Sequence, residues 1–246
     1  MSIITAKGKD AKASLNKKVE KIDFKKLYIR LKDGESCRVR LLSTEDYCEY
    51  LAHASYANGI YTQPCITPVG EKCALCEASN VKAKGFDGLY AKKRYLFAFA
   101  DIDMGQLRLF DATKGQAQQL IAAIEQYAYD LETYAFLFKR TGNKVDTNYS
   151  LSPILRLKHE DKEKFANFDG LTVESDLFES GLQARTRNQQ IALLMDAGFP
   201  VTQLFSSEEV NSARAQIDEW ESVKNGGGDD VKPISPASED EPDSVF

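Results

Sequence analysis

Four side chains that can ligate a metal ion lie within one short stretch of the chain: His53, Cys65, Cys73 and Cys76. Their spacing is His-x11-Cys-x7-Cys-x2-Cys, and the last pair forms a tight knuckle that can bring two thiolates to one metal. Zinc prefers four nitrogen or sulfur ligands in a tetrahedron, and a set supplied wholly by the protein is typical of a structural site. Pro64 and Gly70 break regular structure, so we expect the ligands on turns. The stretch predicts a bound zinc ion.

Two other interpretations of these cysteines stay open. One is a free, buried thiol pair beside a surface histidine, and the other is a redox Cys-x2-Cys motif. Redox motifs of that kind belong to a βαβ setting, which the pattern here does not show. The N-terminus has no signal-peptide apolar core, and no run of about 18 apolar residues indicates a membrane span. We therefore expect a reducing, cytoplasmic location, which favours metal binding over disulfides.

Residues suited to catalysis are sparse. His159 is one of two histidines, but it sits in an exposed, Lys- and Glu-rich stretch and is expected at the surface. No glycine-rich phosphate loop followed by Lys-Ser or Lys-Thr is present. Asp101, Asp103 and Asp111 could form a two-metal nuclease set, yet they flank turns, where aspartate is common for local hydrogen bonding. We expect a binding protein and not an enzyme.

Charge is distributed unevenly along the chain. Residues 1–32 carry ten basic and three acidic side chains, a net charge of +7. Residues 225–246 carry six acids and one lysine, a net charge of −5, which is also the net charge of the whole chain. A basic head and an acidic tail suggest a polyanionic partner and competition for it within the chain. The alternative is two solvated ends with no partner.

A β-hairpin is expected over residues 27–41. Apolar side chains alternate with polar ones on both sides of the Asp33-Gly34 turn, which is the period of a strand with one buried face. The opposite face carries only bases and one aromatic ring: Tyr28, Arg30, Lys32, Arg38 and Arg40. Such a face suggests nucleic-acid contact, although a solvated edge strand kept soluble by charge has the same composition.

The remaining elements predict a mainly β protein of the α+β class. Strands are expected at 92–100, 106–110, 134–140 and 149–157, and residues 43–90 should leave and rejoin the sheet through the zinc segment. Thr113 and Gln116 form a capping-box pattern that opens a helix between the second and third of these strands. Several strands with one late helix predict an OB-type Greek-key barrel.

Four regions follow from these patterns. We expect a flexible basic arm at 1–24, a barrel at 25–160 with a zinc-binding insertion at about 48–90, a helical extension at 161–224 and a disordered acidic tail at 225–246. In the extension, helices are predicted at 187–197, ending at Gly198, and from 206 to about 223.

Single-stranded nucleic acid binds where a basic groove follows the backbone and aromatic rings stack on bases. The basic hairpin face and the Lys92–Tyr95 segment can line one such groove, with nearby tyrosines as stacking platforms. An aromatic stripe on a strand is also typical of a core. The predicted nucleic-acid contacts are Tyr28, Arg30, Arg38, Arg40, Tyr56, Tyr61, Lys92, Lys93, Arg94, Tyr95, Lys139 and Arg140.

One His followed by three Cys inside a strand-rich barrel, with a Lys-rich head and an acidic tail, resembles the single-stranded DNA-binding proteins of T-even-like phages. The stretch Phe138–Asn143 followed by Asp146–Ser150 is similar to a segment of related phage replication proteins. The resemblance covers about residues 25–160 and the charged ends. It implies a zinc-containing OB fold that binds single strands without sequence preference, and self-association on DNA through the basic arm.

The same resemblance implies a role for the acidic tail, which would recruit replication and recombination proteins. The tail ends in Asp243-Ser244-Val245-Phe246 and resembles the Phe-ended tip of bacterial single-strand-binding proteins. The expected partner-binding residues are Asp240, Glu241, Asp243 and Phe246. The predicted function is protection and organisation of single strands in phage DNA replication, recombination and repair, in the host cytoplasm. The alternative is a zinc-ribbon adaptor that binds replication or transcription proteins.

Overall fold

The computed structural model describes residues 22–225. The basic arm up to residue 21 and the acidic tail from residue 226 lie outside the described residues. The predictions made for those two segments therefore stay predictions.

Strands and helices alternate irregularly along the chain. The strands are β1 (Ser36–Arg40), β2 (Tyr47–Ser55), β3 (Ile60–Pro64), β4 (Lys92–Asp101), β5 (Gln106–Thr113), β6 (Ala135–Thr141) and β7 (Asn148–Ile154). The helices are α2 (Phe24–Leu27), α3 (Ala74–Val81), α4 (Lys114–Gln126), α5 (His159–Ala166), α6 (Ser175–Gly181), α7 (Arg187–Asp196) and α8 (Ser207–Asn225). Short 3-10 turns lie at η1 (Tyr56–Asn58), η2 (Thr67–Val69), η3 (Lys144–Asp146) and η4 (Val201–Gln203).

All seven strands belong to one antiparallel sheet. Its order is β3-β2-β4-β1-β6-β7, and β5 pairs with β4 beside this path. The predicted α+β class is confirmed. Within the described residues no strand pairing joins β5 to β7, so hydrogen bonds do not close the sheet into a complete barrel.

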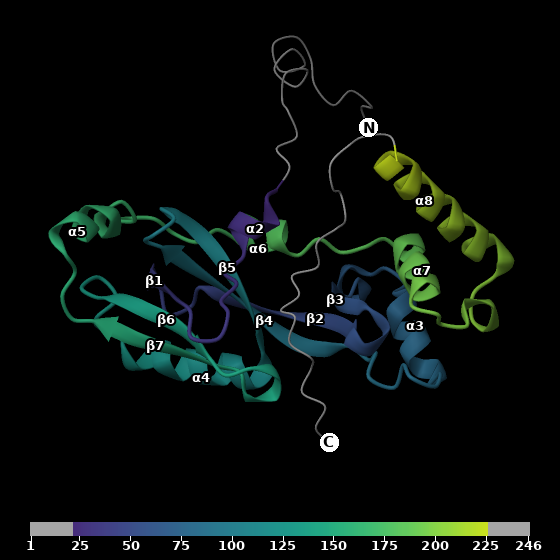
Figure 1. Cartoon of the computed structure of the whole chain (residues 1–246), viewed down its shortest axis with the longest axis horizontal. Helices are drawn as coiled ribbons and strands as arrows, with labels where there is room; N and C mark the ends of the chain where they lie inside the picture. The colour runs from purple at the N-terminus through teal and green to yellow at the C-terminus, as the bar shows by residue number, and fades with distance from the viewer. Residues whose placement is uncertain (1–21, 226–246) are drawn as a thin grey trace, which may run out of the picture.

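Strand β4 is a long central strand that runs between two lobes (Figure 1). The first lobe consists of β1, β5, β6, β7 and α4, and the second of β3, α3, α7 and α8; β2 and β4 span the gap (Figure 1). On β4, Phe97 and Phe99 face one core while Leu96 and Ala98 face another. This is the two-residue period of a strand covered on both sides. Removing each ring from water stabilises the fold by about 1.5–3 kcal/mol, the usual value for a large apolar side chain.

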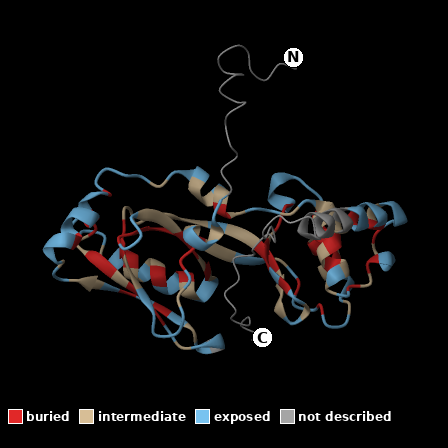
Figure 2. Ribbon diagram, turned by 45° about the horizontal axis from the view of Figure 1, so that its top comes forward, coloured by how far each residue is buried: buried red, intermediate tan, exposed pale blue. Residues whose placement is uncertain are grey.

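Buried residues gather in two main places, one inside the first lobe and one where α3 meets α7 (Figure 2). The first core holds the rings of β4, β5 and β6 under the apolar stripe of α4, formed by Ala117, Leu120 and Ile124. The predicted capping box is present, since Thr113 Oγ1 accepts from Gln116 N and Gln116 Oε1 accepts from Thr113 N. Helix α4 therefore begins directly after Thr113, as the capping-box pattern predicts.

The predicted hairpin at 27–41 is wrong in its first half. Asp23 caps a short helix, α2, by accepting from the backbone N–H groups of Lys25 and Lys26. The residues after α2 do not form a strand. Tyr28 makes only an isolated parallel bridge to Leu109. Strand β1 instead pairs with β4 and β6. The Asp33-Gly34 turn is present, with Gly34 at φ 80°, but it joins β1 to a segment outside the sheet.

Strand β2 falls where no strand was predicted. Six consecutive residues from Tyr47 to Ala52 pair with β4, so the zinc segment begins inside the main sheet. The expectation that all ligands sit on turns is accordingly wrong for two of them, because His53 lies on β2 and Cys76 lies in α3.

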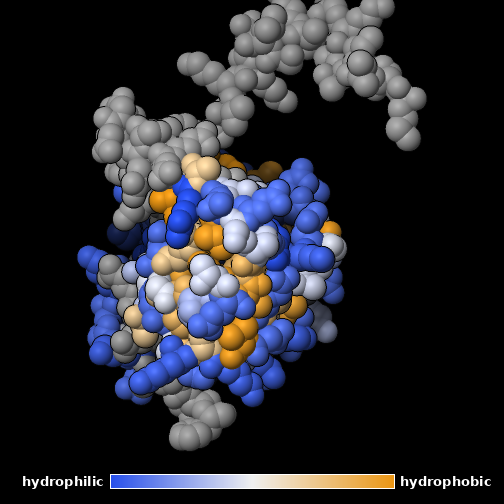
Figure 3. All heavy atoms as spheres, turned by 90° about the vertical axis from the view of Figure 1, so that its right-hand side faces the viewer, coloured by the Kyte–Doolittle hydropathy of each residue, from blue (hydrophilic) through white to orange (hydrophobic). Residues whose placement is uncertain are grey.

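The C-terminal helices lie against three different parts of the molecule. Helix α5 packs beside β1, α6 covers the outer face of β4 and β5, and α7 with α8 packs on α3 (Figure 1). The predicted helices near 187–197 and 206–223 are confirmed as α7 and α8. Seen from the α8 end, hydrophilic residues surround a central hydrophobic area (Figure 3). Across residues 22–225, none of the helices has the length and apolar character needed to cross a bilayer.

Candidate metal centre and nucleic-acid interface

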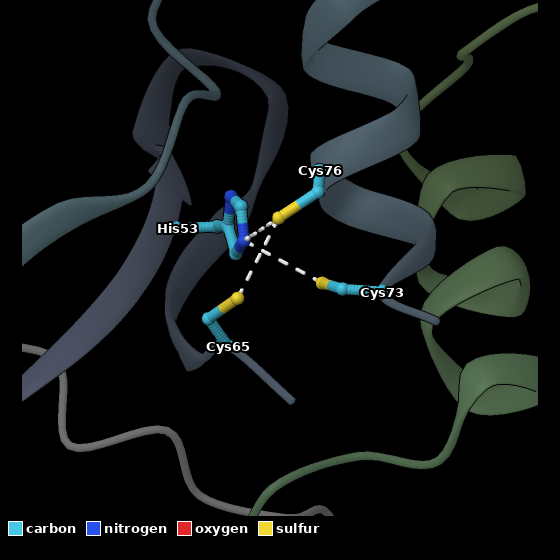
Figure 4. Close-up of side chains that lie close together, drawn as sticks. All are labelled: His53, Cys65, Cys73 and Cys76. Atoms are coloured by element: carbon cyan, nitrogen blue, oxygen red, sulfur yellow. Dashed lines mark hydrogen bonds between the residues drawn. The ribbon is translucent and has the colours of Figure 1, made fainter. Parts of the chain in front are cut away.

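The four predicted ligands converge on one point in the second lobe (Figure 4). Their ligating atoms all lie within 4.8 Å of one another. His53 Nε2 is 3.5 Å from Cys73 Sγ and 3.4 Å from Cys76 Sγ, and Cys65 Sγ is 3.5 Å from Cys76 Sγ. Bond lengths of about 2.3 Å to sulfur and 2.0–2.1 Å to nitrogen in a tetrahedron separate the ligands by roughly 3.5–3.8 Å. The cluster therefore has the dimensions of a tetrahedral metal site.

The four ligands come from two elements, the β2–β3 hairpin and the start of α3. His53 is on β2, and Cys65 follows the end of β3, with its N–H donating to Leu51 O at 2.8 Å. Cys73 is the N-cap residue of α3 and Cys76 lies in the first turn of that helix. Gly70 adopts φ 82° and turns the chain between β3 and α3. A hairpin and a helix thus present two ligands each.

The imidazole of His53 is oriented for coordination. Its ring is completely buried, and its Nδ1 lies 2.7 Å from the carbonyl oxygen of Leu89. A carbonyl can only accept, so Nδ1 carries the proton and Nε2 presents its lone pair to the three sulfurs. A backbone carbonyl behind the ring is the usual support of a metal-ligating histidine.

The three neighbouring thiols disfavour one another's ionisation, and a bound cation would favour it. Burial, and less strongly the neighbouring Cys65 and Cys73, raise the pKa of Cys76 to about 12, while a hydrogen bond with Thr67 acts in the opposite direction. Thr67 Oγ1 lies 3.3 Å from Cys65 Sγ and 3.6 Å from Cys76 Sγ, where its hydroxyl can donate to a thiolate. At neutral pH these protons leave when a metal ion replaces them. The four residues can therefore hold a metal ion.

Several predicted nucleic-acid contacts instead hold the fold together. Tyr28 is 2% exposed and its hydroxyl donates to Gly181 O at 3.0 Å. Arg38 pairs with Asp103 and Asp161. Tyr28 therefore does not lie on an open basic face, because the first half of the predicted hairpin is not a strand.

Arg40 is also built into the structure, since it lies 4.2 Å from the Phe165 ring centroid and pairs with Asp169 at 2.6 Å. On the neighbouring strand, Arg140 is buried and donates to Leu31 O at 2.9 Å. Arg30 is exposed beside Tyr28, and Lys139 is half-buried on β6. Arg40 and Arg140 are thus held by contacts within the first lobe, while Arg30 is exposed.

Arg94 is half-buried and pairs with Asp111 at 2.9 Å, and the Tyr50 hydroxyl donates to the same carboxylate at 2.9 Å. Although burial opposes it, Asp111, Tyr50 and Tyr56 together raise the pKa of Arg94 far above its ordinary value. On the opposite face of the sheet, Lys93 and Tyr95 both bind Glu49, at 2.9 Å each. Arg94 and Lys93 stay charged, but each is paired with a carboxylate that offsets its charge.

Three of the predicted contacts take part in two separate ring contacts, one of which includes a residue that was not predicted. Tyr56 and Tyr61 meet edge to face with ring centroids 6.0 Å apart, and Lys92 Nζ lies 4.8 Å above the Tyr90 ring. Tyr61 is 45% exposed and Tyr90 53% exposed. The segments that carry the two pairs lie on either side of β2, because Lys92 and Pro64 both pair with Ala52. We call Tyr56, Tyr61, Tyr90 and Lys92 the aromatic patch.

No protein-family model matches the chain, and no curated protein sequence matches it either.

The three aspartates of the nuclease alternative are each engaged by an arginine. Asp101 pairs with Arg108 at 2.8 Å, Asp103 with Arg38, and Asp111 with Arg94. Asp101 and Asp111 lie at opposite ends of the β4–β5 hairpin, as its register shows. His159 is exposed at the start of α5, as predicted.

Sequence reasoning missed two parts of the site. Leu89 supports His53 through its carbonyl oxygen, which no side-chain pattern can reveal. Tyr90 was overlooked although it stands two residues before the basic strand that begins at Lys92. Gly88, two residues before it, indicates a surface loop, where an exposed aromatic ring is a hint of binding.

Proposed function

We propose that this protein binds single-stranded nucleic acid without sequence preference and uses a zinc ion to shape the binding lobe. Three thiolates and one imidazole in a tetrahedral arrangement favour zinc over harder cations. Since all four positions are taken by the protein, the ion would be structural and would leave no position for a catalytic water. It would tie β2, β3 and α3 together beneath the aromatic patch.

The connectivity of the first lobe supports an OB-type arrangement. If the β2–β3 insertion is set aside, five strands remain in the order β5-β4-β1-β6-β7, with α4 between the third and fourth in sequence. The seam between β5 and β7 is bridged by the rings of Phe110 and Tyr149, 4.5 Å apart. OB folds are often partly open, and they bind oligonucleotides on the face of the second and third strands and on the loop after the first strand.

The single observation that carries the proposal is the position of the aromatic patch. In the OB scheme the zinc segment is the loop between the first and second strands, and Lys92 begins the second strand. Helices α2 and α6 cover the middle of the β4–β5 outer face, around Leu96 and Leu109. The exposed rings of Tyr61 and Tyr90 and the ammonium group of Lys92 lie on the segments that flank β2, with Lys92 above the Tyr90 ring. Exposed rings beside a cation are what base stacking requires.

The proposed biological role follows the resemblance to phage single-stranded DNA-binding proteins. The chain would coat single strands during phage DNA replication, recombination and repair. Its basic arm would promote self-association, and its acidic tail, with Asp240, Glu241, Asp243 and Phe246, would recruit partner proteins. The two ends would affect binding electrostatically, because residues 1–32 carry a net charge of +7 and residues 225–246 a net charge of −5.

Replacing single rings tests the proposal. Tyr61→Ala and Tyr90→Ala should each weaken binding to an oligothymidine by about 1–3 kcal/mol if the ring stacks on a base. Tyr129→Ala is the matched control, because Tyr129 is fully exposed after α4, in the other lobe. The readout is fluorescence anisotropy of a labelled oligonucleotide. Equal affinities in all three variants would remove the patch from the interface, and no binding by the wild type would favour the zinc-ribbon adaptor.

A further inference from the structure

Helix α7 reaches into the metal centre from a distant part of the chain. Gln190 is completely buried, and its Oε1 accepts a hydrogen bond of 2.8 Å from the backbone N–H of Ala74. Ala74 stands between Cys73 and Cys76 and is the first residue of α3. The first N–H groups of a helix have no partner within it, so this amide would otherwise be buried without one.

The amide of Gln190 cannot turn over without losing its contacts. Its Nε2 donates to Arg185 O at 3.2 Å, which directs the carbonyl oxygen towards Ala74. The start of α7 is itself fixed by a capping box between Thr186 and Gln189. The acceptor that holds the knuckle is therefore positioned by the helix and by the turn before it.

Arg187, one turn earlier on α7, grips the same segment from both ends. Its guanidinium donates to both carboxylate oxygens of Glu77 at 3.0 and 2.8 Å, and to Lys72 O at 3.3 Å. It also donates to Glu209 on α8 at 3.0 Å and lies over the ring of Phe205. Residues 72 and 77 bracket the knuckle, so one arginine ties both of its flanks to α7 and α8.

We infer that Gln190 and Arg187 are positioning residues of the metal centre, which act by holding Cys73 and Cys76 at coordination distance. Neither residue contacts the site of the ion, and both act through the backbone and first turn of α3. The metal and the α7–α8 pair then stabilise each other, because a ligand that binds only the assembled state shifts the equilibrium towards it. The inference rests on the metal occupancy proposed above but is independent of nucleic-acid binding.

A pair of matched variants distinguishes positioning from general stability. Gln190→Met keeps the side-chain volume and removes both hydrogen bonds. Val210→Ala removes volume from the same core, where Val210 is buried on α8, but keeps every contact to the knuckle. Zinc release to an excess of chelator should be roughly tenfold faster in Gln190→Met than in the wild type. In Val210→Ala it should change by less than about threefold, when both variants are measured equally far below their unfolding midpoints.

The cobalt form reports the geometry directly. Gln190→Met loaded with Co²⁺ should lose intensity or shift its visible d–d bands, whereas Val210→Ala should keep the wild-type spectrum. Should Gln190→Met not fold, Glu77→Gln replaces it, because Glu77 is partly exposed and its loss frees one flank of the knuckle. Glu77→Gln is also expected to release zinc faster than Val210→Ala.

Equal zinc-release rates and identical cobalt spectra in Gln190→Met and Val210→Ala would overturn the inference. The proposed metal site itself would still stand. A wild-type protein that binds neither Zn²⁺ nor Co²⁺ would instead refute the proposed zinc, and the inference with it. The two failures are therefore distinguishable in one set of measurements.

Discussion

At the scale of single residues, the metal centre depends on four side chains that have few alternative uses. His53 is completely buried, with one ring nitrogen bound to Leu89 O and the other directed at sulfur atoms. A buried imidazole nitrogen without a strong partner is costly, and a metal ion supplies the strongest available. The surroundings of His53 therefore indicate a metal ion as strongly as the cysteines do.

We predict one zinc ion per chain, lost in Cys73→Ser. The ion should couple to folding of the second lobe by less than the roughly 10–16 kcal/mol seen in small zinc peptides, because the sheet also supports β2. Elemental analysis of purified protein measures the stoichiometry. Cys48→Ser is the control, since Cys48 is half-buried on β2 but packs against a different core. Wild-type protein without zinc, or zinc retained in full by Cys73→Ser, would contradict this prediction.

A second residue-scale prediction concerns alkaline pH. Burial, together with the nearby Asp101, raises the pKa of the Cys37 thiol from 9.0 to about 12. The unfolded chain loses this proton first, so the stabilisation is complete below about pH 9 and is lost as pH rises towards 12. The slope approaches about 1.4 kcal/mol per pH unit. Urea unfolding of zinc-loaded protein at pH 8 and pH 10.5 should show a smaller loss of stability in Cys37→Ala than in the wild type. Parallel losses in the two proteins would show that this thiol does not titrate as stated.

At the scale of elements, helix α4 should be sensitive to its cap. Thr113→Ala removes an acceptor from the first turn and should lower the free energy of unfolding by about 1 kcal/mol. Chemical denaturation measures the loss, and Thr133→Ala, at an exposed threonine, serves as the control. A loss no larger than that of the control would mean that the helix start is fixed by packing alone.

Elements with strong local signals could be predicted from the sequence, and those built by distant contacts could not. Strand β4 alternates large and small apolar residues, and α4 carries both its cap and its stripe. The segment after Asp23 has the same alternation as a strand, but Tyr28 is held by Gly181, 153 residues away. Strand β2 mixes polar and apolar residues on both faces, since it serves a different core at each end. Periodicity cannot reveal either arrangement.

The candidate site divides in the same way. The four metal ligands lie close in sequence, and their chemistry is explicit, so their convergence could be predicted. The partners of Arg38 lie 65 and 123 residues away, and no local pattern shows that acidic side chains will cover it. A basic strand face read from sequence is therefore open or neutralised depending on the tertiary structure.

At the scale of the whole molecule, the charged ends should govern binding at low salt. The segment 225–246 carries a net charge of −5 and should compete with nucleic acid for basic surface, at an effective concentration in the millimolar range. Deleting residues 225–246 should raise affinity for single strands, most at low ionic strength. The length-matched control converts the six acids to amides and should behave like the deletion. Unchanged affinity at low salt in both variants would reject competition by charge.

The most direct test of the account is the salt dependence of binding to an oligothymidine and to a duplex of equal length. The full chain with zinc bound should bind the single strand more tightly at every salt concentration. The logarithm of its binding constant should fall linearly with the logarithm of salt, by about 0.7 for each phosphate neutralised, and Lys92→Gln should reduce that slope. No binding to the single strand, or equal affinity for the duplex, would contradict the proposed function.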